Sequence, residues 1–149
     1  MSGKTNWQNM KKSFQGISKI ALDSNIFIYY FGGDPIFGPK TKAVFNLLKK
    51  KKGVTSIITL TELLAFKTDQ KTLSEIEEAF FNTPNLNIAD IDKAIAKNAA
   101  RIRHKYGFRL ADSFQLATAV AFKADIFVTN DKRLKSFPEV KIQLLSEIS

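Results

Sequence analysis

Apolar and polar residues alternate along this chain in blocks that fit two kinds of element. Short apolar blocks rich in β-branched residues predict buried strands at residues 19–22, 54–58, 126–129 and 142–145, with a weaker candidate at 86–88. Blocks whose apolar residues recur three and four positions apart predict helices at residues 26–31, 41–52, 61–67, 72–81, 91–106 and 110–122. Because strands and helices alternate, the chain is predicted to form a parallel sheet covered by helices.

Residues that cap or stop helices mark the boundaries of these blocks. Suitable N-terminal caps stand before three of the predicted helices: Ser24 or Asn25, Thr59 or Thr61, and Asp90. Glycine commonly follows the last turn of a helix because it tolerates the left-handed conformation found there. Gly53 and Gly107 are therefore predicted to end the helices that precede them.

The N-terminal residues 1–18 form no such block. They are rich in Lys, Asn, Gln and Gly, and they predict a polar lead-in ahead of a single domain over residues 19–149. The lead-in lacks the apolar core of a signal peptide, and no stretch of the chain approaches the roughly 20 apolar residues that cross a membrane. We therefore expect a cytoplasmic protein that does not enter a membrane.

Composition removes several classes of chemistry. The 149 residues, 44% of them hydrophobic, are enough to bury a core, and the absence of cysteine excludes disulfides, zinc–thiolate sites and thiol nucleophiles. The phosphate-binding patterns G-x-x-x-x-G-K and G-x-G-x-x-G and the nucleophile motif G-x-S-x-G are also missing. P-loop hydrolysis, dinucleotide binding and a serine–histidine triad are therefore disfavoured, and the single histidine, His104, is interpreted as a surface residue.

Four acidic residues stand where apolar stretches end or turn. Asp23 and Asp131 directly follow predicted strands, Glu62 opens a helix after a strand, and Asp112 lies at the start of another helix. Ligands of parallel sheets bind beyond the carboxyl ends of the strands, so we expect these four side chains to converge there. Converging carboxylates repel each other unless a multivalent cation holds them, so the pattern predicts a metal site.

Each acid also has an ordinary structural explanation. Asp and Glu are favoured at helix starts and in turns because free backbone N–H groups bind them. For any one of the four this explanation is the stronger, and only their joint occurrence favours a site. The other acids singled out lie in polar surroundings and are interpreted as capping or solvated residues: Glu75, Glu77, Glu78, Asp90, Asp92 and Glu139.

The segments around these acids resemble the motifs of a known family. ALDSNIFIYYF, the helix with Glu62, LADSFQLATA and FVTNDKRL are similar, in the same order, to the four motifs of PIN-domain nucleases. The resemblance spans about residues 19–145, is most specific in DSN and VTND, and is greatest toward small stand-alone VapC-type toxins of toxin–antitoxin pairs. The polar lead-in departs from those toxins.

This resemblance implies a three-layer α/β/α sandwich with a central parallel sheet of about five strands. It implies a metal-dependent endoribonuclease that binds Mg²⁺ or Mn²⁺, with RNA and a small antitoxin protein as partners. The implied catalytic and metal-binding residues are Asp23, Glu62, Asp112 and Asp131, supported by the polar residues Ser24, Asn25 and Asn130. Asp23 and Asp112 are the expected principal ligands.

Two basic segments are candidates for RNA contact. RIRHKYGFR, at residues 101–109, places Arg101, Lys105 and Arg109 around two aromatic residues, and cations bind phosphates while aromatic rings stack on bases. A solvated helix end whose cations suit the helix dipole explains this segment equally well. The lysine run at residues 49–52 is a weaker candidate. The net charge of +9 fits either an anionic partner such as nucleic acid or simple solubility.

Other uses of the chain remain open. The apolar residues Phe27, Tyr30, Phe45 and Leu48 either fill the core, which is favoured, or cover a surface for a homodimer or an antitoxin peptide. A non-catalytic PIN-like RNA-binding or scaffold protein is disfavoured because all four acids are present. A metal-dependent phosphohydrolase acting on small phosphate esters is disfavoured by the net charge and by the lack of a second Asp in a D-x-D arrangement.

Overall fold

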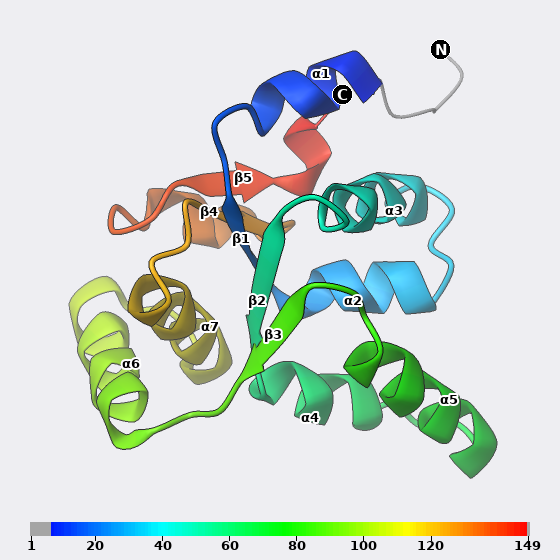
Figure 1. The fold of residues 1–149 in the computed structure, drawn as a ribbon. Coiled ribbons are helices and arrows are strands. Elements are labelled where there is room, and N and C mark those ends of the chain that lie inside the picture. The colour runs from blue at the N-terminus through cyan, green and yellow to red at the C-terminus, as the bar shows by residue number, and fades with distance from the viewer. Residues whose placement is uncertain (1–6, 149) are drawn as a thin grey trace.

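The computed structural model describes residues 7–148 and places them in one sheet with helices on both faces (Figure 1). The sheet has five strands, all parallel, in the spatial order β3-β2-β1-β4-β5. Their bounds are Lys19–Leu22 (β1), Lys52–Ser56 (β2), Leu86–Ala89 (β3), Ile126–Thr129 (β4) and Ile142–Leu144 (β5). The predicted fold class and the predicted strands are confirmed, with small shifts at the ends.

The helices of the described residues pack in two groups. On one face lie α1 (Trp7–Ser13), α2 (Ser24–Phe31), α3 (Gly38–Leu47), α4 (Ile58–Leu64) and α5 (Gln70–Phe81). On the other lie α6 (Lys93–Tyr106), α7 (Leu110–Ala121) and the short 3-10 helix η1 (Lys132–Ser136). A second 3-10 helix, η2 (Leu145–Glu147), follows β5.

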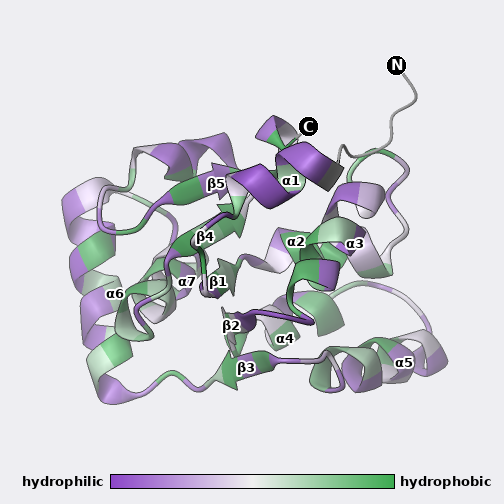
Figure 2. Cartoon of the chain, turned by 45° about the horizontal axis from the view of Figure 1, so that its top comes forward, coloured by the Kyte–Doolittle hydropathy of each residue, from purple (hydrophilic) through white to green (hydrophobic). Residues whose placement is uncertain are grey.

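Alternation along the strands builds both cores. Successive side chains of a strand point to opposite faces, and in β1 Ile20 and Leu22 join the core under α2 and α3 while Ala21 joins the core under α6 and α7. In β4, Phe127 is buried between residues that face the opposite core. Figure 2 shows the result as hydrophobic strands surrounded by helices with a hydrophilic outer side. The sheet is therefore covered on both faces, as parallel sheets generally are.

The helix predicted over residues 41–52 extends beyond the C-terminal end of the observed helix α3. It ends at Leu47, and the chain has already entered β2 at Lys52, so Gly53 lies in a strand and does not stop a helix. A Cβ atom on Gly53 would approach the two Leu48 methyl carbons to 3.0 and 3.1 Å. The glycine therefore serves close packing of the buried Leu48 against β2, a need that no local pattern reveals.

Three predicted caps are also wrong. The cap of α2 is Asp23 itself, whose side chain accepts from the Ser24 N–H, and the cap of α6 is Asp92 and not Asp90. The helix α4 begins at Ile58, so Thr59 is not a cap and Glu62 lies beyond the first turn. The predicted end at Gly107 is confirmed, since its φ of 77° is left-handed.

The predicted polar lead-in contains a helix that contributes to the core. Residues 1–6 lie outside the described part, but Met10 of α1 is fully buried, and Phe14, which follows this helix, is only 1% exposed. The Lys51 ammonium group donates to the carbonyls of Phe14 and Ile17, which fixes the end of this segment against β2. The pattern did not reveal α1 because its apolar residues are few and its outer side is polar.

The apolar residues of the early helices serve mainly the core, as favoured. Phe27 and Leu48 are buried and Phe45 is partly buried, while Tyr30 remains 40% exposed. None of the helices in residues 7–148 combines the length and the apolar character needed to cross a membrane.

Candidate active site

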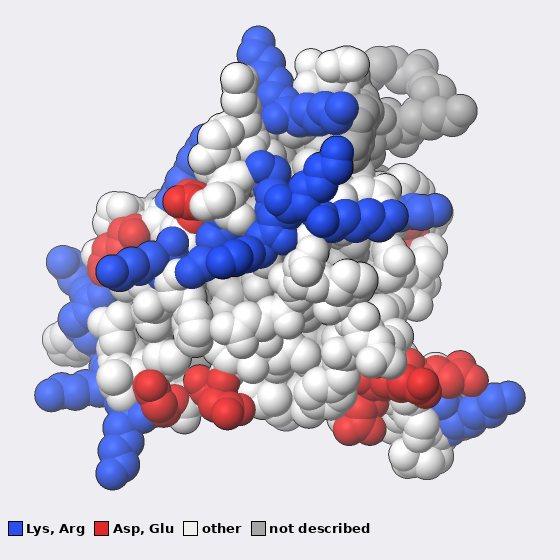
Figure 3. All heavy atoms as spheres, viewed as in Figure 1, with Lys and Arg blue, Asp and Glu red and all other residues white. Residues whose placement is uncertain are grey.

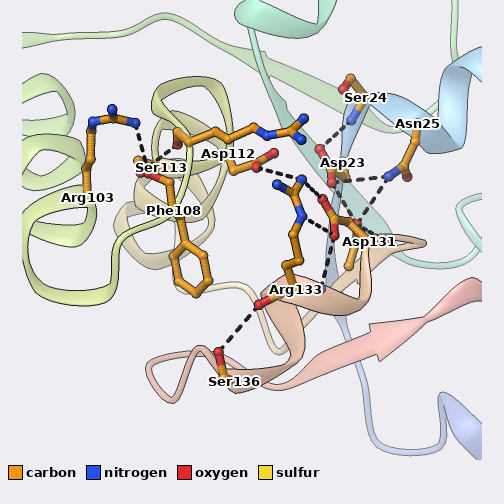
Figure 4. A network of polar contacts seen from close by, with 12 residues as sticks. Asp23, Ser24, Asn25, Arg103, Phe108, Asp112, Ser113, Asp131, Arg133 and Ser136 are labelled. Carbon is orange, nitrogen blue, oxygen red and sulfur yellow. Dashed lines mark hydrogen bonds and ion pairs between the residues drawn. The ribbon is translucent and has the colours of Figure 1, made fainter.

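The four predicted acids lie together at the carboxyl ends of the strands, and Figure 4 shows three of them. Asp23 follows β1, Asp131 follows β4, Glu62 lies on α4 and Asp112 lies in the first turn of α7. Burial raises the pKa of Asp23, Glu62 and Asp112, and neighbouring carboxylates add to it: Asp112 acts on Asp23 and Glu62, and Asp131 acts on Asp112. Asp112 therefore lies within electrostatic reach of each of the other three acids.

Asp23 is the most buried of the four, with 3% of its surface exposed. Its Oδ1 accepts a hydrogen bond from the Ser24 backbone N–H at 2.8 Å, and its Oδ2 accepts one from the Thr129 hydroxyl at 2.7 Å. Burial nevertheless raises the pKa of Asp23 to about 7, because desolvation outweighs both hydrogen bonds. A cation at this position would restore the ionised form.

Thr129, the last residue of β4, joins two of the acidic segments. Its buried hydroxyl donates to Asp23, and its oxygen accepts from the Asp131 backbone N–H at 3.1 Å and from the Asn25 amide at 3.3 Å. Sequence reasoning missed Thr129 as a site residue. The signal was a hydroxyl at the end of the apolar run IFVT, since a buried hydroxyl needs a partner.

Glu62 and Asp112 are each about half-buried and sit on neighbouring helices. Burial raises the pKa of Glu62, and a hydrogen bond from the Ser24 side chain opposes that rise. Ser24 therefore binds Asp23 through its backbone N–H and lies close enough to Glu62 to affect its pKa. Its supporting role in the site stays a prediction.

A guanidinium group of the same chain occupies the rest of the site (Figure 4). Arg133, in η1, donates from Nε to Asp131 Oδ1 at 2.9 Å and pairs with Asp131 Oδ2 through Nη2. The same Nη2 lies 3.6 Å from Asp112 Oδ2. The Arg133 hydrogen bonds lower the pKa of Asp131 against its partial burial, so this acid stays ionised. The sequence interpretation assigned no role to Arg133.

A buried chain of hydrogen bonds connects α7, α4, β2 and β1. Gln115 Nε2 donates to Thr59 Oγ1 at 2.8 Å, the hydroxyls of Thr59 and Thr55 are 2.8 Å apart, and the Thr55 hydroxyl donates to the Leu22 carbonyl at 2.8 Å. All three side chains are at most 2% exposed. Buried polar groups without partners are costly, so this chain stabilises one relative arrangement of the four elements.

The members of this chain stand close to acids in the sequence. Gln115 lies one helical turn after Asp112, Thr59 lies three residues before Glu62, and the Leu22 carbonyl immediately precedes Asp23. The chain therefore fixes the supports of three of the four carboxylates. Sequence reasoning missed it because Gln and Thr inside apolar helices give no indication of their partners.

Asn25 and Asn130, the other two predicted supporting residues, have different partners. Asn25 Nδ2 lies 3.4 Å from Asp23 Oδ2, within the acidic network. Asn130 instead donates to the Tyr29 hydroxyl at 3.3 Å and accepts from the Ser146 backbone N–H at 3.1 Å. Asn130 therefore joins α2 and η2 to the turn after β4, beside the acids rather than among them.

The basic residues proposed for RNA contact have different partners. Arg101 pairs with Glu139 through two hydrogen bonds of 2.6 and 3.0 Å, and Lys105 lies over the aromatic ring of the residue that follows it. Arg109 precedes α7, and its charge opposes the burial that raises the pKa of Asp112. Of the three, Arg109 is the one that lies beside the acids. His104 is exposed, as predicted.

The donors of the site suit a hard divalent cation. Carboxylate oxygens are the ligands that Mg²⁺ and Mn²⁺ favour, and the buried Oδ1 of Asn25 has no hydrogen-bond partner among the described residues. In the arrangement of residues 7–148, no three His, Cys, Asp or Glu side chains are grouped closely enough to hold a metal ion. Arg133 supplies the positive charge at Asp112 and Asp131 instead. The site therefore offers the donor types that such a cation favours, and in this arrangement Arg133 neutralises two of its carboxylates.

Comparisons with known proteins agree on one family. The family model of the PIN domain matches residues 20–140. VapBC2 from Rickettsia felis, solved with a DNA fragment from their promoter, gives a TM-score of 0.70 at 19% identity over 85% of this chain and 98% of that chain. DNA-bound VapBC from Salmonella typhimurium gives 0.69 at 22% identity, over 87% and 99%.

A toxin–antitoxin complex from Klebsiella pneumoniae gives a TM-score of 0.67 at 23% identity, over 87% of this chain and 99% of that chain. No curated protein matches the chain. At these identities the likeness to solved structures establishes the fold.

Proposed function

The chain belongs to the PIN domain family, and from that premise we propose that it is a Mg²⁺- or Mn²⁺-dependent endoribonuclease. The proposed reaction is hydrolysis of a phosphodiester bond in RNA at the site formed by Asp23, Glu62, Asp112 and Asp131.

One observation carries the proposal. Four carboxylates from four separate elements converge at the carboxyl edge of the sheet, and burial raises the pKa of three of them. Holding such groups together disfavours their ionised form, and a bound divalent cation reverses this. A cation in an acidic pocket of a protein with net charge +9 suits a polyanionic substrate.

Asp23 and Asp112 would be the principal ligands, and Glu62 and Asp131 would complete the set. The bound cation supplies an activated water and neutralises the phosphate. Thr129 and Ser24 keep the Asp23 carboxylate in place through hydrogen bonds at both of its oxygens. The chain from Gln115 to the Leu22 carbonyl keeps α7 and α4 at a constant distance from β1.

Glu62 is the better candidate for accepting the proton of the attacking water. Its pKa is raised, mainly by burial, whereas hydrogen bonds from Arg133 lower the pKa of Asp131. A base works best when its pKa is close to the ambient pH, so the raised pKa favours Glu62. Arg133 pairs with Asp131 in the metal-free site, and a guanidinium group there would be able to bind a phosphate of the substrate.

Incubation with a mixed RNA pool tests the activity, with Mg²⁺, with Mn²⁺ and with EDTA. Cleavage in either metal that EDTA stops is the expected result. Binding without cleavage in both metals would identify a scaffold protein. Turnover of a small phosphate ester but not of RNA would identify a phosphohydrolase. Either of those outcomes would overturn the proposal.

Matched variants test the site. Asp23→Asn is expected to lower cleavage by more than about a hundredfold, beyond the 10- to 100-fold loss typical of residues that only support metal ligands. Asp90→Asn removes the same charge at an exposed position and is expected to retain activity. Glu62→Gln is expected to be strongly impaired, and exposed Glu75→Gln on α5 is its control. A folded Asp23→Asn protein with full activity would exclude the site.

We propose further that the protein is the toxin of a toxin–antitoxin pair. One of the similar structures is described as a toxin–antitoxin complex. In this chain a hollow of about 240 Å³ opens between α2, α4 and α5, lined by the apolar side chains of Ile28, Phe31, Leu63, Phe66 and Ile76. Phe66 is 51% exposed. An apolar segment of a small antitoxin would bury these groups.

Co-purification with the product of the neighbouring gene tests this pairing. Phe66→Ser is expected to weaken the complex and to leave RNA cleavage unchanged, because the Phe66 side chain lines the apolar hollow and not the acidic site. Phe81→Ser, also 51% exposed but outside the hollow, is the control. Equal binding by both variants would exclude this hollow as the docking site.

A further inference from the structure

A groove lined by lysine lies at the amino ends of the strands, opposite the acids. One hollow of about 690 Å³ lies between α1 and the end of α3, and a second of about 610 Å³ lies at the starts of β1 and β2. The two share Lys50 and Lys51. A third, of about 440 Å³, runs along the starts of β2 and β3 and shares Lys19, Lys52 and Asn85 with the second. The shared lining residues place the three hollows side by side, and we refer to them together as the groove.

Lysines dominate this groove and carboxylates are absent from its walls. The lining includes Lys11, Lys12, Lys19, Lys49, Lys50, Lys51 and Lys52, and no Asp or Glu among the described residues lines any of the three hollows. Figure 3 shows Lys and Arg in a band across the upper part of this face, with most of the Asp and Glu near its lower edge. Cations at this density repel one another, and a bound polyanion relieves that repulsion.

Asp125 lies beside the start of β1, and hydrogen bonds already hold its carboxylate in place. Asp125 Oδ2 accepts hydrogen bonds from the Ser18 backbone N–H, the Ser18 hydroxyl and the Lys19 N–H, at 2.9 to 3.0 Å. These hydrogen bonds lower the pKa of Asp125, so it stays ionised and fixes the start of β1. It reduces the positive potential at one point of the groove without entering the walls.

The N-terminal helix forms one wall of the groove. α1 lies ahead of residues 20–140, which match the PIN domain, and its buried side chains Met10 and Phe14 fix it to the core. Its exposed side presents Lys11 and Lys12 to the first hollow. The groove therefore depends on a segment that this chain carries in addition to the matched domain.

The lysines divide into fixed and exposed groups. The Lys51 ammonium group binds two backbone carbonyls, and that of Lys19 donates to the Phe122 carbonyl at 2.8 Å. Carbonyls carry no net charge, so these lysines keep their positive charge while shaping the groove. Lys49, Lys50 and Lys52 are exposed and extend from its walls.

We propose that this groove is a second binding site for RNA, which holds the phosphate backbone of a strand away from the point of cleavage. Lysine contacts with phosphates are independent of base sequence, so the site supplies affinity rather than target choice. The identity of the polyanion as RNA rests on the proposed function, whereas backbone binding by the groove does not require cleavage.

A nucleic acid fits this surface better than a membrane. Membrane-surface segments combine basic residues with exposed large apolar side chains that enter the lipid. The exposed large apolar residues of the described chain lie outside the groove: Tyr30, Ile36, Phe66, Phe81 and Leu110. The walls carry amide side chains instead, among them Gln15 and Asn46, which suit phosphate and sugar oxygens.

The two sites stand at opposite ends of the same strand. Lys19 begins β1 and Asp23 follows its end, which separates their backbones by about 13 Å at about 3.3 Å per residue. One RNA strand reaches both sites only by passing around the sheet. The groove is therefore expected to affect long RNA and to leave very short substrates unaffected.

RNA binding in EDTA tests the groove without involving cleavage. The probe is a fluorescent oligouridine of about 20 nucleotides, longer than the 4–16 nucleotides of a typical single-strand site. The triple variant Lys49→Gln/Lys50→Gln/Lys52→Gln spares the structural Lys51 and Lys19. We expect its affinity in low salt to fall at least tenfold, and its salt-dependence slope to shrink by roughly 2, at about 0.7 per lost phosphate contact.

A charge-matched variant is the control. Lys67→Gln/Lys71→Gln/Lys97→Gln removes three exposed lysines outside the groove, so both triple variants lower the net charge of +9 by the same amount. The control is expected to bind RNA nearly as wild type. Lys11→Gln/Lys12→Gln is expected to weaken binding less than the groove triple and to retain the far-ultraviolet circular dichroism of the wild type.

The outcomes separate the groove from the nuclease. Loss of RNA affinity in the groove triple alone supports the groove, even if no variant cleaves RNA. Equal loss in both triples would show a simple effect of net charge and would overturn it. Unchanged RNA affinity in the groove triple, accompanied by lost binding to polyglutamate or to vesicles of anionic phospholipid, would also overturn the proposed RNA site.

Discussion

The two ends of the sheet carry opposite charges and hold them in opposite ways. At the carboxyl end, Asp23 is 3% exposed and each of its oxygens has a hydrogen-bond donor. At the amino end, Lys49, Lys50 and Lys52 are exposed on the walls of an open groove. The buried charge is fixed in position at an energetic cost, whereas the exposed charges cost little because water solvates them.

This difference matches what the two ends are proposed to do. Chemistry on one bond needs groups held within a fraction of an ångström, so the carboxylates are tied to Thr129, Ser24 and Arg133. Holding a flexible phosphate chain needs only a high density of cations, which long side chains supply without fixed geometry.

The largest expected effect concerns the anchor of the groove wall. Phe14→Ala is expected to lower the free energy of unfolding by about 3–5 kcal/mol, because Phe14 is 1% exposed within the core and its removal leaves a cavity. Gln15→Ala, at an exposed position, is the control. Urea unfolding measures both, and a loss below about 1 kcal/mol at Phe14 would show that α1 is dispensable to the core.

The next effect concerns the buried chain of hydrogen bonds that begins at Gln115 and lies near the acids. Gln115→Met removes the donor to Thr59 and is expected to lower RNA cleavage by about 10- to 100-fold, as outer supports of metal sites do. It is also expected to raise the Mg²⁺ concentration needed for half-maximal cleavage, since the carboxylates lose their fixed spacing.

Thr118→Val is the matched control for that variant. Thr118 is also buried on α7, but its hydroxyl donates to the Phe114 carbonyl within the helix and does not link elements. If both variants lose the same activity with the same Mg²⁺ dependence, then Gln115 acts only through general stability.

A third effect concerns the cost of burying Asp23. In the unfolded chain this acid releases its proton near pH 3.8, whereas in the metal-free folded protein it keeps the proton until about pH 7. The folded state therefore binds more protons between these values, and the stability of the wild type falls as pH rises through them. Above about pH 7 both states are ionised and the loss is complete.

Asp23→Asn has no such titration. Its free energy of unfolding in EDTA is expected to exceed that of the wild type by an amount that grows from pH 4 to pH 7, by more than about 1 kcal/mol, since one pKa unit corresponds to about 1.4 kcal/mol. Urea unfolding across this range measures it. A constant difference between the two proteins would show that burial of Asp23 carries no electrostatic cost.

The smallest effect concerns Arg133, whose guanidinium group pairs with Asp131. Arg133→Ala is expected to tighten Mn²⁺ binding roughly two- to fivefold, because a half-exposed ion pair is worth up to about 1 kcal/mol and no longer competes for Asp131. Calorimetric titration of RNA-free protein measures this. Lys132→Ala removes one neighbouring exposed charge and is the control. Equal tightening in both would mean that Arg133 acts only through bulk charge.

Sequence reasoning predicted more of the framework than of the site. β1 and β4 were predicted at their observed bounds, since short buried apolar runs have few alternatives. Boundaries failed where a residue type has two uses: Gly53 stops helices in general, but here it makes room for Leu48. The lead-in was assigned no helix, because two buried side chains, Met10 and Phe14, are too few to form a pattern.

What the chain determined by itself is the identity of the strands, the parallel sheet and the edge at which the four acids meet. These follow from local periodicity and from the rule that parallel strands end on one side. Only the tertiary structure decided which partners those acids have. Thr129 lies 106 residues from Asp23 and Gln115 lies 56 residues from Thr59, so these contacts depend on how the elements pack. The lysine groove arises in the same way, because its walls meet only when α1 folds onto the core.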